Sequence, residues 1–210
     1  ILGDRCPLKA IAEVTAKHGA LLFVDEAHSL GVLGEQGKGR IEEEGVEADF
    51  IVGTFSKSLG STGGFCVSRH KALSLFRYAS RPYMFTASPC PSVVATTREA
   101  LKQMQKRPEL RTMLWDNALD LYSGLKELNL NVGPEPSPIV AVRVQSREQG
   151  LLIWQKLVES GVYLNLILPP AAPDGNVLLR CSVSASHTHD QIQKIIEAFE
   201  SNSKYFTHSK

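Results

Sequence analysis

An α/β fold with a mostly parallel sheet is the class that this sequence predicts. Short apolar runs that read as buried strands occupy residues 20–25, 49–54 and 64–68, and stretches with helical spacing lie between and after them. Near-continuous apolar runs separated by helices are typical of parallel sheets that are covered on both faces. Polar residues end two of these runs, which places candidate ligand-binding groups at one edge of the sheet.

The elements of the first half follow from local signals. A helix is predicted over residues 7–18, because its apolar residues repeat at helical spacing and Pro7 and Gly19 mark its ends. The fully buried strand 20–25 comes next. It is followed by a glycine-rich loop, a short acidic helix and the strands 49–54 and 64–68.

The second half reads as a smaller α/β unit. Helices are predicted at about 89–104 and 108–128, and a Pro/Gly/Asn connector spans 129–138. The remaining predictions are strands at 139–144, 162–168 and 177–183 and helices at 148–160 and 189–199. We therefore expect a large-domain part at 1–107, a small C-terminal domain at 108–202 and a polar, frayed tail at 203–210.

Composition excludes several classes of function. The 210 residues carry 23 Lys+Arg against 22 Asp+Glu, so no basic footprint for nucleic acid is present, and no apolar run is long enough to span a membrane. Four cysteines without paired spacing favour reduced thiols in a cytoplasmic protein. The chain begins at Ile1, and we expect it to be the C-terminal part of a longer polypeptide.

Asp25 and Lys57 form the most informative pair. Asp25 ends one apolar run and Lys57 follows another. Pyridoxal phosphate (PLP) requires a lysine that forms a Schiff base with its aldehyde and an acid that keeps its pyridine nitrogen protonated. Alone, an aspartate at this place is more often a helix cap or one partner of a salt bridge. The pair meets two separate demands of one cofactor.

Neighbouring side chains fit the same cofactor. The hydroxyls of Thr54 and Ser56 flank Lys57 and are suited to bind a phosphate. His28 lies three residues after Asp25, within reach of the oxygen on the cofactor ring, although loop backbone could satisfy it instead.

Three alternative readings concern single motifs. Residues 25–28 spell D-E-A-H, as in nucleotide-hydrolysing helicases, but no G-x-x-x-x-G-K-[ST] loop is present in the chain. His187 and His189 resemble a metal pair, yet Thr188 and Gln191 form a capping-box pattern, and we predict no metal site. Arg180 lies within an apolar strand, where it is expected either to bind a substrate carboxylate or to form an internal salt bridge.

These segments resemble the α-oxoamine synthases, PLP enzymes of fold type I that condense an amino acid with an acyl-CoA and release carbon dioxide. The resemblance covers nearly the whole chain and is carried by residues 24–29, 53–58, 81–88, 169–173 and 178–182. Within the family it favours the serine-using branch, which joins L-serine to palmitoyl-CoA to give 3-ketosphinganine, the first step of sphingolipid synthesis.

The resemblance also implies roles for individual residues. It makes Lys57 the Schiff-base lysine and the acid/base at the substrate α-carbon, Asp25 the partner of the pyridine nitrogen and His28 the partner of the ring oxygen. Thr86 and Ala87 would reach the cofactor phosphate of a neighbouring subunit, which implies a homodimer. Arg180 would hold the substrate carboxylate.

Two alternatives stay open at this point. A sister enzyme of the same family would use glycine or alanine in place of L-serine. A non-catalytic partner subunit would resemble the family but lack the Schiff-base lysine, whereas Lys57 is present here within an intact motif.

Overall fold

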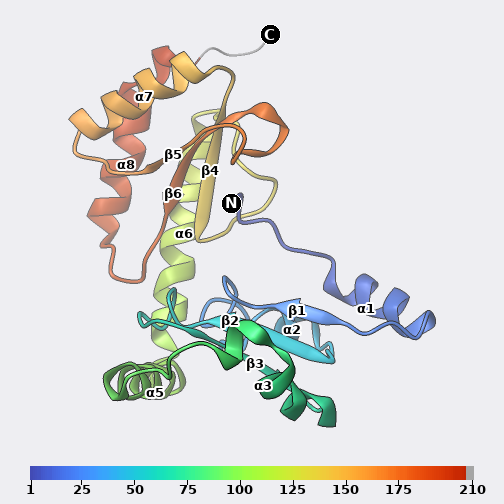
Figure 1. Cartoon of the computed structure of the whole chain (residues 1–210). Helices are drawn as coiled ribbons and strands as arrows, with labels where there is room; N and C mark the ends of the chain where they lie inside the picture. Colours follow the sequence, from blue (N-terminus) through green and yellow to red (C-terminus); the bar gives the residue numbers. More distant parts are fainter. Residues whose placement is uncertain (207–210) are drawn as a thin grey trace. The chain divides into compact units, whose positions relative to one another are not determined.

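The computed structural model describes residues 1–206 of the chain. It divides into two compact units, one formed by residues 6–111 and the other by residues 1–5 together with the described residues from 112 on. Figure 1 shows the elements of both units along the chain. Each unit is described by itself.

The N-terminal unit carries three strands and a set of mostly short helices. In chain order they are α1 (Leu8–Lys17), β1 (Phe23–Asp25), α2 (Arg40–Glu44), β2 (Phe50–Thr54), β3 (Gly64–Ser68), the 3-10 helix η1 (Lys71–Leu75), α3 (Phe76–Ala79), α4 (Arg81–Met84) and α5 (Pro91–Lys106).

The sheet of this unit has the strand order β1-β2-β3. β1 and β2 run parallel, with Asp25 opposite Val52, whereas β3 runs antiparallel to β2. The predicted α/β class is confirmed, and the described strands form a mixed sheet with one parallel and one antiparallel pair. Because β1 and β2 are parallel, the segments that follow Asp25 and Thr54 leave the sheet at the same edge.

Strand β1 is shorter and less buried than predicted. Only its central residue, Val24, is buried, and Phe23 and Asp25 are exposed. The ladder does not extend back to residue 20, because the Leu22 amide donates to the Asp49 side chain at 2.7 Å. The expectation of a fully buried strand over 20–25 was therefore wrong.

The C-terminal unit is a second α/β layer. Its elements are α6 (Glu109–Glu127), which begins just before the unit, β4 (Ile139–Val144), α7 (Arg147–Glu159), β5 (Asn165–Ile167), the 3-10 helix η2 (Pro173–Gly175), β6 (Val177–Ser182), α8 (His189–Ser201) and the 3-10 helix η3 (Ser203–Tyr205).

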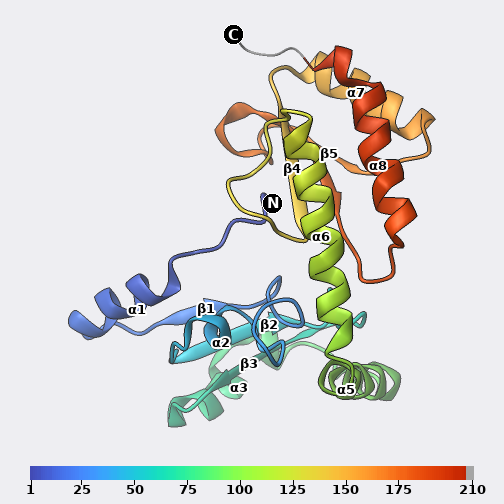
Figure 2. The ribbon, with the colours of Figure 1, turned by 180° about the vertical axis from the view of Figure 1, so that it is seen from behind.

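One antiparallel sheet with the order β4-β6-β5 organises this unit. Alternate residues of β4 and β6 join residues of α6, α7 and α8 in a single core. The three helices therefore cover the same face of the sheet, and Figure 2 shows α6 and α8 in front of it. The opposite face carries the other alternate residues, among them Arg180.

Two predictions for this unit need correction. β5 covers only Asn165–Ile167 rather than 162–168, because the Leu164 carbonyl accepts a hydrogen bond from the Trp154 indole at 3.0 Å instead of joining the ladder. Residues 203–205, expected within a polar tail, form η3, and Phe206 after it packs in the core beside Phe199. Residues 207–210 of that tail lie outside the described part.

None of the helices among residues 1–206 is both long enough and apolar enough to cross a membrane.

Candidate functional site

Asp25 lies at the carboxyl end of β1 with its side chain exposed. Its Oδ1 accepts a hydrogen bond from the Ala27 amide at 2.8 Å. Within residues 1–206 this is the hydrogen bond that the carboxylate makes, so Oδ2 is available to a ligand. His28 follows in the same turn, and its side chain is also exposed.

Lys57 lies in a tight turn that follows β2. The Gly60 amide donates to the Lys57 carbonyl at 3.0 Å, and the Ser61 amide donates to the Phe55 carbonyl at 2.7 Å. The Lys57 side chain is exposed, and its ammonium makes no hydrogen bond or ion pair within the described chain. A lysine held on a fixed backbone with a free amine is suited to bond covalently to a ligand.

Two hydroxyls lie beside the lysine. Thr54 Oγ1 and Ser56 Oγ are 2.7 Å apart, and Thr54 Oγ1 also donates to the Gly63 carbonyl at 3.0 Å. With the Thr54 hydrogen directed to Gly63, the exposed Ser56 hydroxyl is the donor that can turn to an anionic ligand.

The loops that carry Asp25 and Lys57 are joined directly. The Ser58 hydroxyl donates to the Leu30 carbonyl at 2.6 Å. The Cβ that any other residue would bring to position 31 would lie 2.9 Å from Ser58 Cβ, so Gly31 permits this approach. The structure thus brings Asp25, His28, Thr54, Ser56 and Lys57 to one edge of the sheet, as the two apolar runs predicted.

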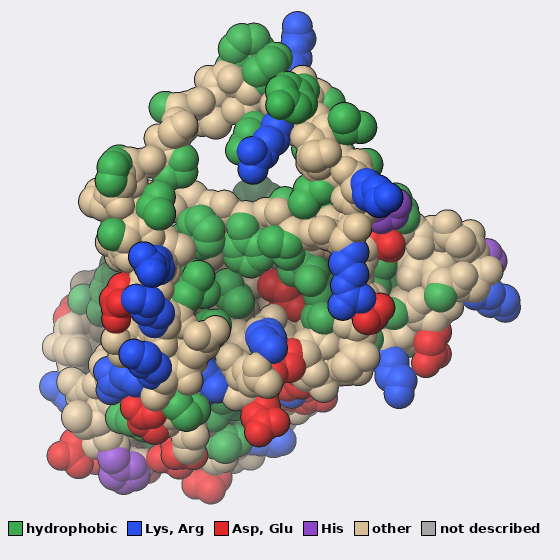
Figure 3. Space-filling view, turned by 90° about the horizontal axis from the view of Figure 1, so that it is seen from below, with side chains coloured by type: hydrophobic (Ala, Val, Ile, Leu, Met, Phe, Trp, Pro, Cys, Tyr) green, Lys and Arg blue, Asp and Glu red, His purple; other side chains and the backbone are tan. Residues whose placement is uncertain are grey.

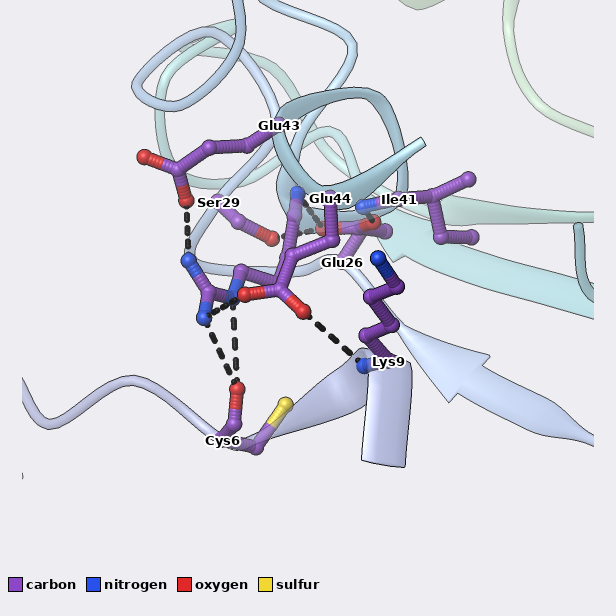
Figure 4. Close-up of polar contacts among 8 residues, drawn as sticks. Cys6, Lys9, Glu26, Ser29, Ile41, Glu43 and Glu44 are labelled. Carbon is purple, nitrogen blue, oxygen red and sulfur yellow. Dashed lines mark hydrogen bonds and ion pairs between the residues drawn. The ribbon is translucent and has the colours of Figure 1, made fainter. Parts of the chain in front are cut away.

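Glu26 is a residue whose importance the sequence interpretation missed. Its side chain is 1 % exposed, and its carboxylate accepts hydrogen bonds from the amides of Arg40 and Ile41 at 2.8 and 2.7 Å. Figure 4 shows Glu26 reaching α2 and Ser29. The only sequence signal is the glycine at position 39, immediately before the capped helix.

Thr86 and Ala87 lie apart from these loops in the chain, in the segment that follows α4. Both side chains are exposed. The Thr86 amide donates to the Tyr83 carbonyl at 3.3 Å, and within residues 1–206 Thr86 makes no hydrogen bond to Asp25 or Lys57.

Arg180 belongs to the C-terminal unit. On β6 it lies opposite Ala141 of β4 and Asn165 of β5. Its Nε is buried and has no hydrogen-bond partner in the described part of the chain. A buried guanidinium donor without a partner is costly, so a bound carboxylate would complete this position.

The histidines at 187 and 189 make local contacts. The predicted capping box is confirmed, since Thr188 and Gln191 exchange hydrogen bonds at the start of α8. His187 Nδ1 accepts the Ser184 amide at 3.1 Å, and His189 Nδ1 lies 3.4 Å from Asp120 Oδ2. Among the side chains that the structure describes, there is no group of three or more His, Cys, Asp or Glu that could hold a metal ion.

The chain is similar to a known protein family and to several characterised proteins. The family model described as aminotransferase class I and II matches residues 2–199. Serine palmitoyltransferase of Caulobacter vibrioides is 52% identical over 201 residues, which are 95% of this chain and 50% of that protein. The chain therefore spans about half the length of the curated relatives it matches.

Two further relatives are similar to this chain at different levels of identity. A solved structure of serine palmitoyltransferase (SPT) with PLP internal aldimine superimposes with a TM-score of 0.93 at 47% identity, covering 97% of this chain and 52% of the other. The 8-amino-7-oxononanoate synthase of Alkaliphilus metalliredigens is 34% identical over 94% of this chain and 51% of its own length.

Proposed function

Because the chain belongs to the aminotransferase class I and II family, we propose that the full-length protein is a PLP-dependent acyltransferase that condenses L-serine with a long-chain acyl-CoA. The observation that carries the proposal is the edge of the sheet where Asp25 and Lys57 follow two parallel strands. The 52% identity to a serine palmitoyltransferase supports the choice of reaction and of palmitoyl-CoA.

The residues at this edge fit PLP. Lys57 has an amine without a protein partner, Asp25 has a free carboxylate oxygen, and Ser56 presents a hydroxyl that can turn outward. Lys57 would attach the cofactor covalently, Asp25 and His28 would contact its ring, and Thr54 and Ser56 would bind near its phosphate. When bound, PLP supplies an electron sink for the charge that develops at the α-carbon of the amino acid.

The chain's own residues then act on protons and charges. The Asp25 carboxylate would hold the proton on the ring nitrogen, where a negative charge close by favours the protonated form. Lys57 Nζ would remove the proton from the α-carbon of L-serine and return one at the end. Between these transfers the C–C bond to the acyl carbonyl carbon forms, the thioester C–S bond breaks, and the substrate carboxylate leaves as carbon dioxide, giving 3-ketosphinganine.

Arg180 is proposed to bind the carboxylate of L-serine. Its unpartnered, buried Nε supports this role, because a carboxylate would satisfy the planar fork of the guanidinium. No acidic residue lies opposite it in the sheet, where Ala141 and Asn165 flank it.

A homodimer is proposed as the active form. Large apolar side chains are exposed in and around η1, α3 and α4, among them Tyr78 at 77 % and Phe85 at 80 % exposure. Figure 3 shows hydrophobic side chains at the surface, among basic and acidic ones, on the face that it draws. Apolar side chains gathered in this way favour burial against another chain or segment. Thr86 and Ala87, which follow α4, would then reach the cofactor phosphate of the partner. A cytoplasmic location stays a prediction.

The second candidate function is that of a sister enzyme that uses glycine or alanine. The 34% identity to an 8-amino-7-oxononanoate synthase favours keeping it. A non-catalytic partner subunit is disfavoured by the free amine of Lys57.

A product assay tests the choice of substrate. The full-length protein with PLP and palmitoyl-CoA is given L-serine, glycine or L-alanine, and CoA release and the ketone product are measured. We expect kcat/KM with L-serine to exceed the other values by at least about 10-fold, as for sites that bind a substrate hydroxyl. A preference for glycine or alanine would keep the family and overturn the proposed substrate.

A further inference from the structure

Glu26 is a buried carboxylate that makes no ion pair with a lysine or arginine within the described residues. It lies directly after Asp25 and two positions before His28, and its side chain is 1 % exposed. A buried charge without a paired cation is costly unless several donors surround it. The structure supplies such donors.

Three donors meet the Glu26 carboxylate. Oε2 accepts the Arg40 amide at 2.8 Å, and Oε1 accepts the Ile41 amide at 2.7 Å. These are the first amides of α2, which have no partner inside the helix. The Ser29 hydroxyl also donates to Oε2, and these contacts can be followed in Figure 4.

The backbone of Glu26 is held equally firmly. Its amide donates to the Val52 carbonyl of β2 at 2.8 Å, and its carbonyl accepts the Leu30 and Ser29 amides at 2.9 and 3.2 Å. Glu26 therefore connects the strand that leads to Lys57 with the turn that contains His28.

Gly39 provides room for the carboxylate. A Cβ at position 39 would lie 2.3 Å from Glu26 Oε2, a distance that real Cβ atoms essentially never show, and its φ of 101° also disfavours other residues. The glycine before α2 and the glutamate after Asp25 therefore depend on each other.

The same turn contacts the lysine loop, through the hydrogen bond from the Ser58 hydroxyl to the Leu30 carbonyl. A displacement of the turn would thus move Asp25, His28 and the backbone next to Lys57.

We propose that Glu26 is a positioning residue that fixes Asp25 and His28 relative to Lys57 by capping α2 and closing the turn between them. The proposal rests on the proposed function, because it assigns PLP as the ligand of that edge. Glu26 itself does not contact the ligand in this account. It acts through the backbone of the turn and through α2.

A glutamine at position 26 has nearly the same shape but would place an NH₂ group where one of the two carboxylate oxygens lies. In either orientation one backbone amide, that of Ile41 or that of Arg40, would then face another donor and lose its partner. The turn is expected to shift, and the Asp25 and His28 side chains with it.

Glu42 offers a matched control on α2. Its carboxylate also accepts backbone amides from the same loop, those of Gln36 at 3.0 Å and Lys38 at 2.8 Å. These contacts hold the far end of the loop, and the Glu42 side chain is only half-buried. Glu42→Gln therefore perturbs a similar cap away from Asp25 and His28.

The test measures PLP binding and unfolding of the full-length protein. Equilibrium titration of the apo form with PLP gives Kd, and urea unfolding of the same apo samples gives stability. We expect Glu26→Gln to raise the Kd for PLP by at least about 10-fold, as for the loss of a hydrogen bond to a buried charge. Glu42→Gln is expected to change it by less than about twofold.

A double-mutant cycle separates positioning from general destabilisation. If Glu26 acts through Asp25 and His28, Glu26→Gln should raise Kd by less than about threefold in a protein that already carries Asp25→Asn, while its effect on unfolding stays the same. If Glu26→Gln does not fold, Ser29→Ala removes one donor only and should raise the Kd about threefold.

Four results would contradict the proposal. An unchanged Kd in Glu26→Gln or Ser29→Ala overturns it while the proposed function stands. Equal effects of Glu26→Gln and Glu42→Gln, or additive effects with Asp25→Asn, overturn it as well. A wild-type protein that binds no PLP overturns the proposed function and this inference together.

Discussion

The two units of the chain bury their apolar side chains very differently. In the C-terminal unit 18 buried residues from three helices, two strands and the adjoining loops form one core. The corresponding cluster in the N-terminal unit has three buried residues, Leu8, Leu22 and Val24. A single large core is what makes a domain stable by itself.

The N-terminal unit nevertheless carries the candidate cofactor site. Asp25, His28, Ser56 and Lys57 are all exposed there, and so are large apolar residues such as Phe23, Tyr78 and Phe85. The comparison indicates that the residues of the candidate site are held in place by local hydrogen bonds, such as those of Glu26 and Ser58, rather than by a deep core. It also supports the proposal that other segments or a second subunit cover this unit.

Replacing Lys57 separates chemistry from stability most strongly. Lys57→Ala removes the proposed covalent attachment and the proton transfers, so kcat with L-serine and palmitoyl-CoA should fall by about 10⁴-fold or more. Since Lys57 is exposed and unpaired within residues 1–206, the urea midpoint should not move. Loss of folding in this variant would contradict the view that Lys57 serves the proposed chemistry and not the stability of the N-terminal unit.

Thiol labelling compares the two units directly. Burial raises the pKa of Cys181, in the C-terminal core, to about 12, whereas a hydrogen bond from Ser92 lowers the pKa of the exposed Cys90 thiol. A thiolate forms only as the pH approaches the pKa, so at pH 8 the thiolate fraction of Cys181 should be smaller by at least about 10³-fold.

Mass spectrometry after iodoacetamide treatment measures this difference. Cys90 is expected to react in the native protein, faster as the pH rises from 7 to 8. Cys181 should react only after urea unfolds the C-terminal unit. Native labelling of Cys181 at a similar rate would show that the C-terminal core opens easily.

Truncating a core side chain sharpens the comparison. Leu125 is 0 % exposed in α6, and Leu125→Ala should lower the free energy of unfolding of the C-terminal unit by about 2–5 kcal/mol. Leu75→Ala, at a side chain that is 61 % exposed in the N-terminal unit, should stay within about 0.5 kcal/mol in the monomer. Equal losses of unfolding free energy in the two variants would contradict the difference in apolar burial between the two units.

Arg180 tests whether the C-terminal unit contributes to substrate binding. Arg180→Lys keeps the positive charge but loses the planar fork, so KM for L-serine should rise about 10-fold with a smaller change in KM for palmitoyl-CoA. The matched control is Arg143→Lys, on the same sheet, where Arg143 lies opposite Leu178. A rise in KM of the same size in both variants would argue against a specific carboxylate contact.

The sequence anticipated the elements that have strong periodicity. β3, β4 and the start of α8 lie where the apolar runs and the capping box placed them. The edge with Asp25 and Lys57 could also be predicted, because an apolar run that ends in a polar residue marks the carboxyl end of a strand.

Features that depend on distant partners could not be predicted. An apolar run does not reveal that the Leu22 amide bonds to the Asp49 side chain, or that the Leu164 carbonyl bonds to Trp154. The short helices of residues 71–84 lack the length that makes a helical period readable. Glu26 stands within the D-E-A-H motif, and its contact with α2 could not be read from the sequence. The two amides that it binds lie 14 and 15 positions later in the chain.

The central claim is that Lys57, at the edge shared with Asp25, holds PLP. The most direct test is to incubate the full-length protein with PLP, reduce with borohydride, digest, and map the added mass by mass spectrometry. We expect one modified peptide that carries the cofactor on Lys57, lost in Lys57→Ala and reduced in Asp25→Asn. Modification spread over several exposed lysines, with Lys57 no more labelled than Lys38, would contradict it.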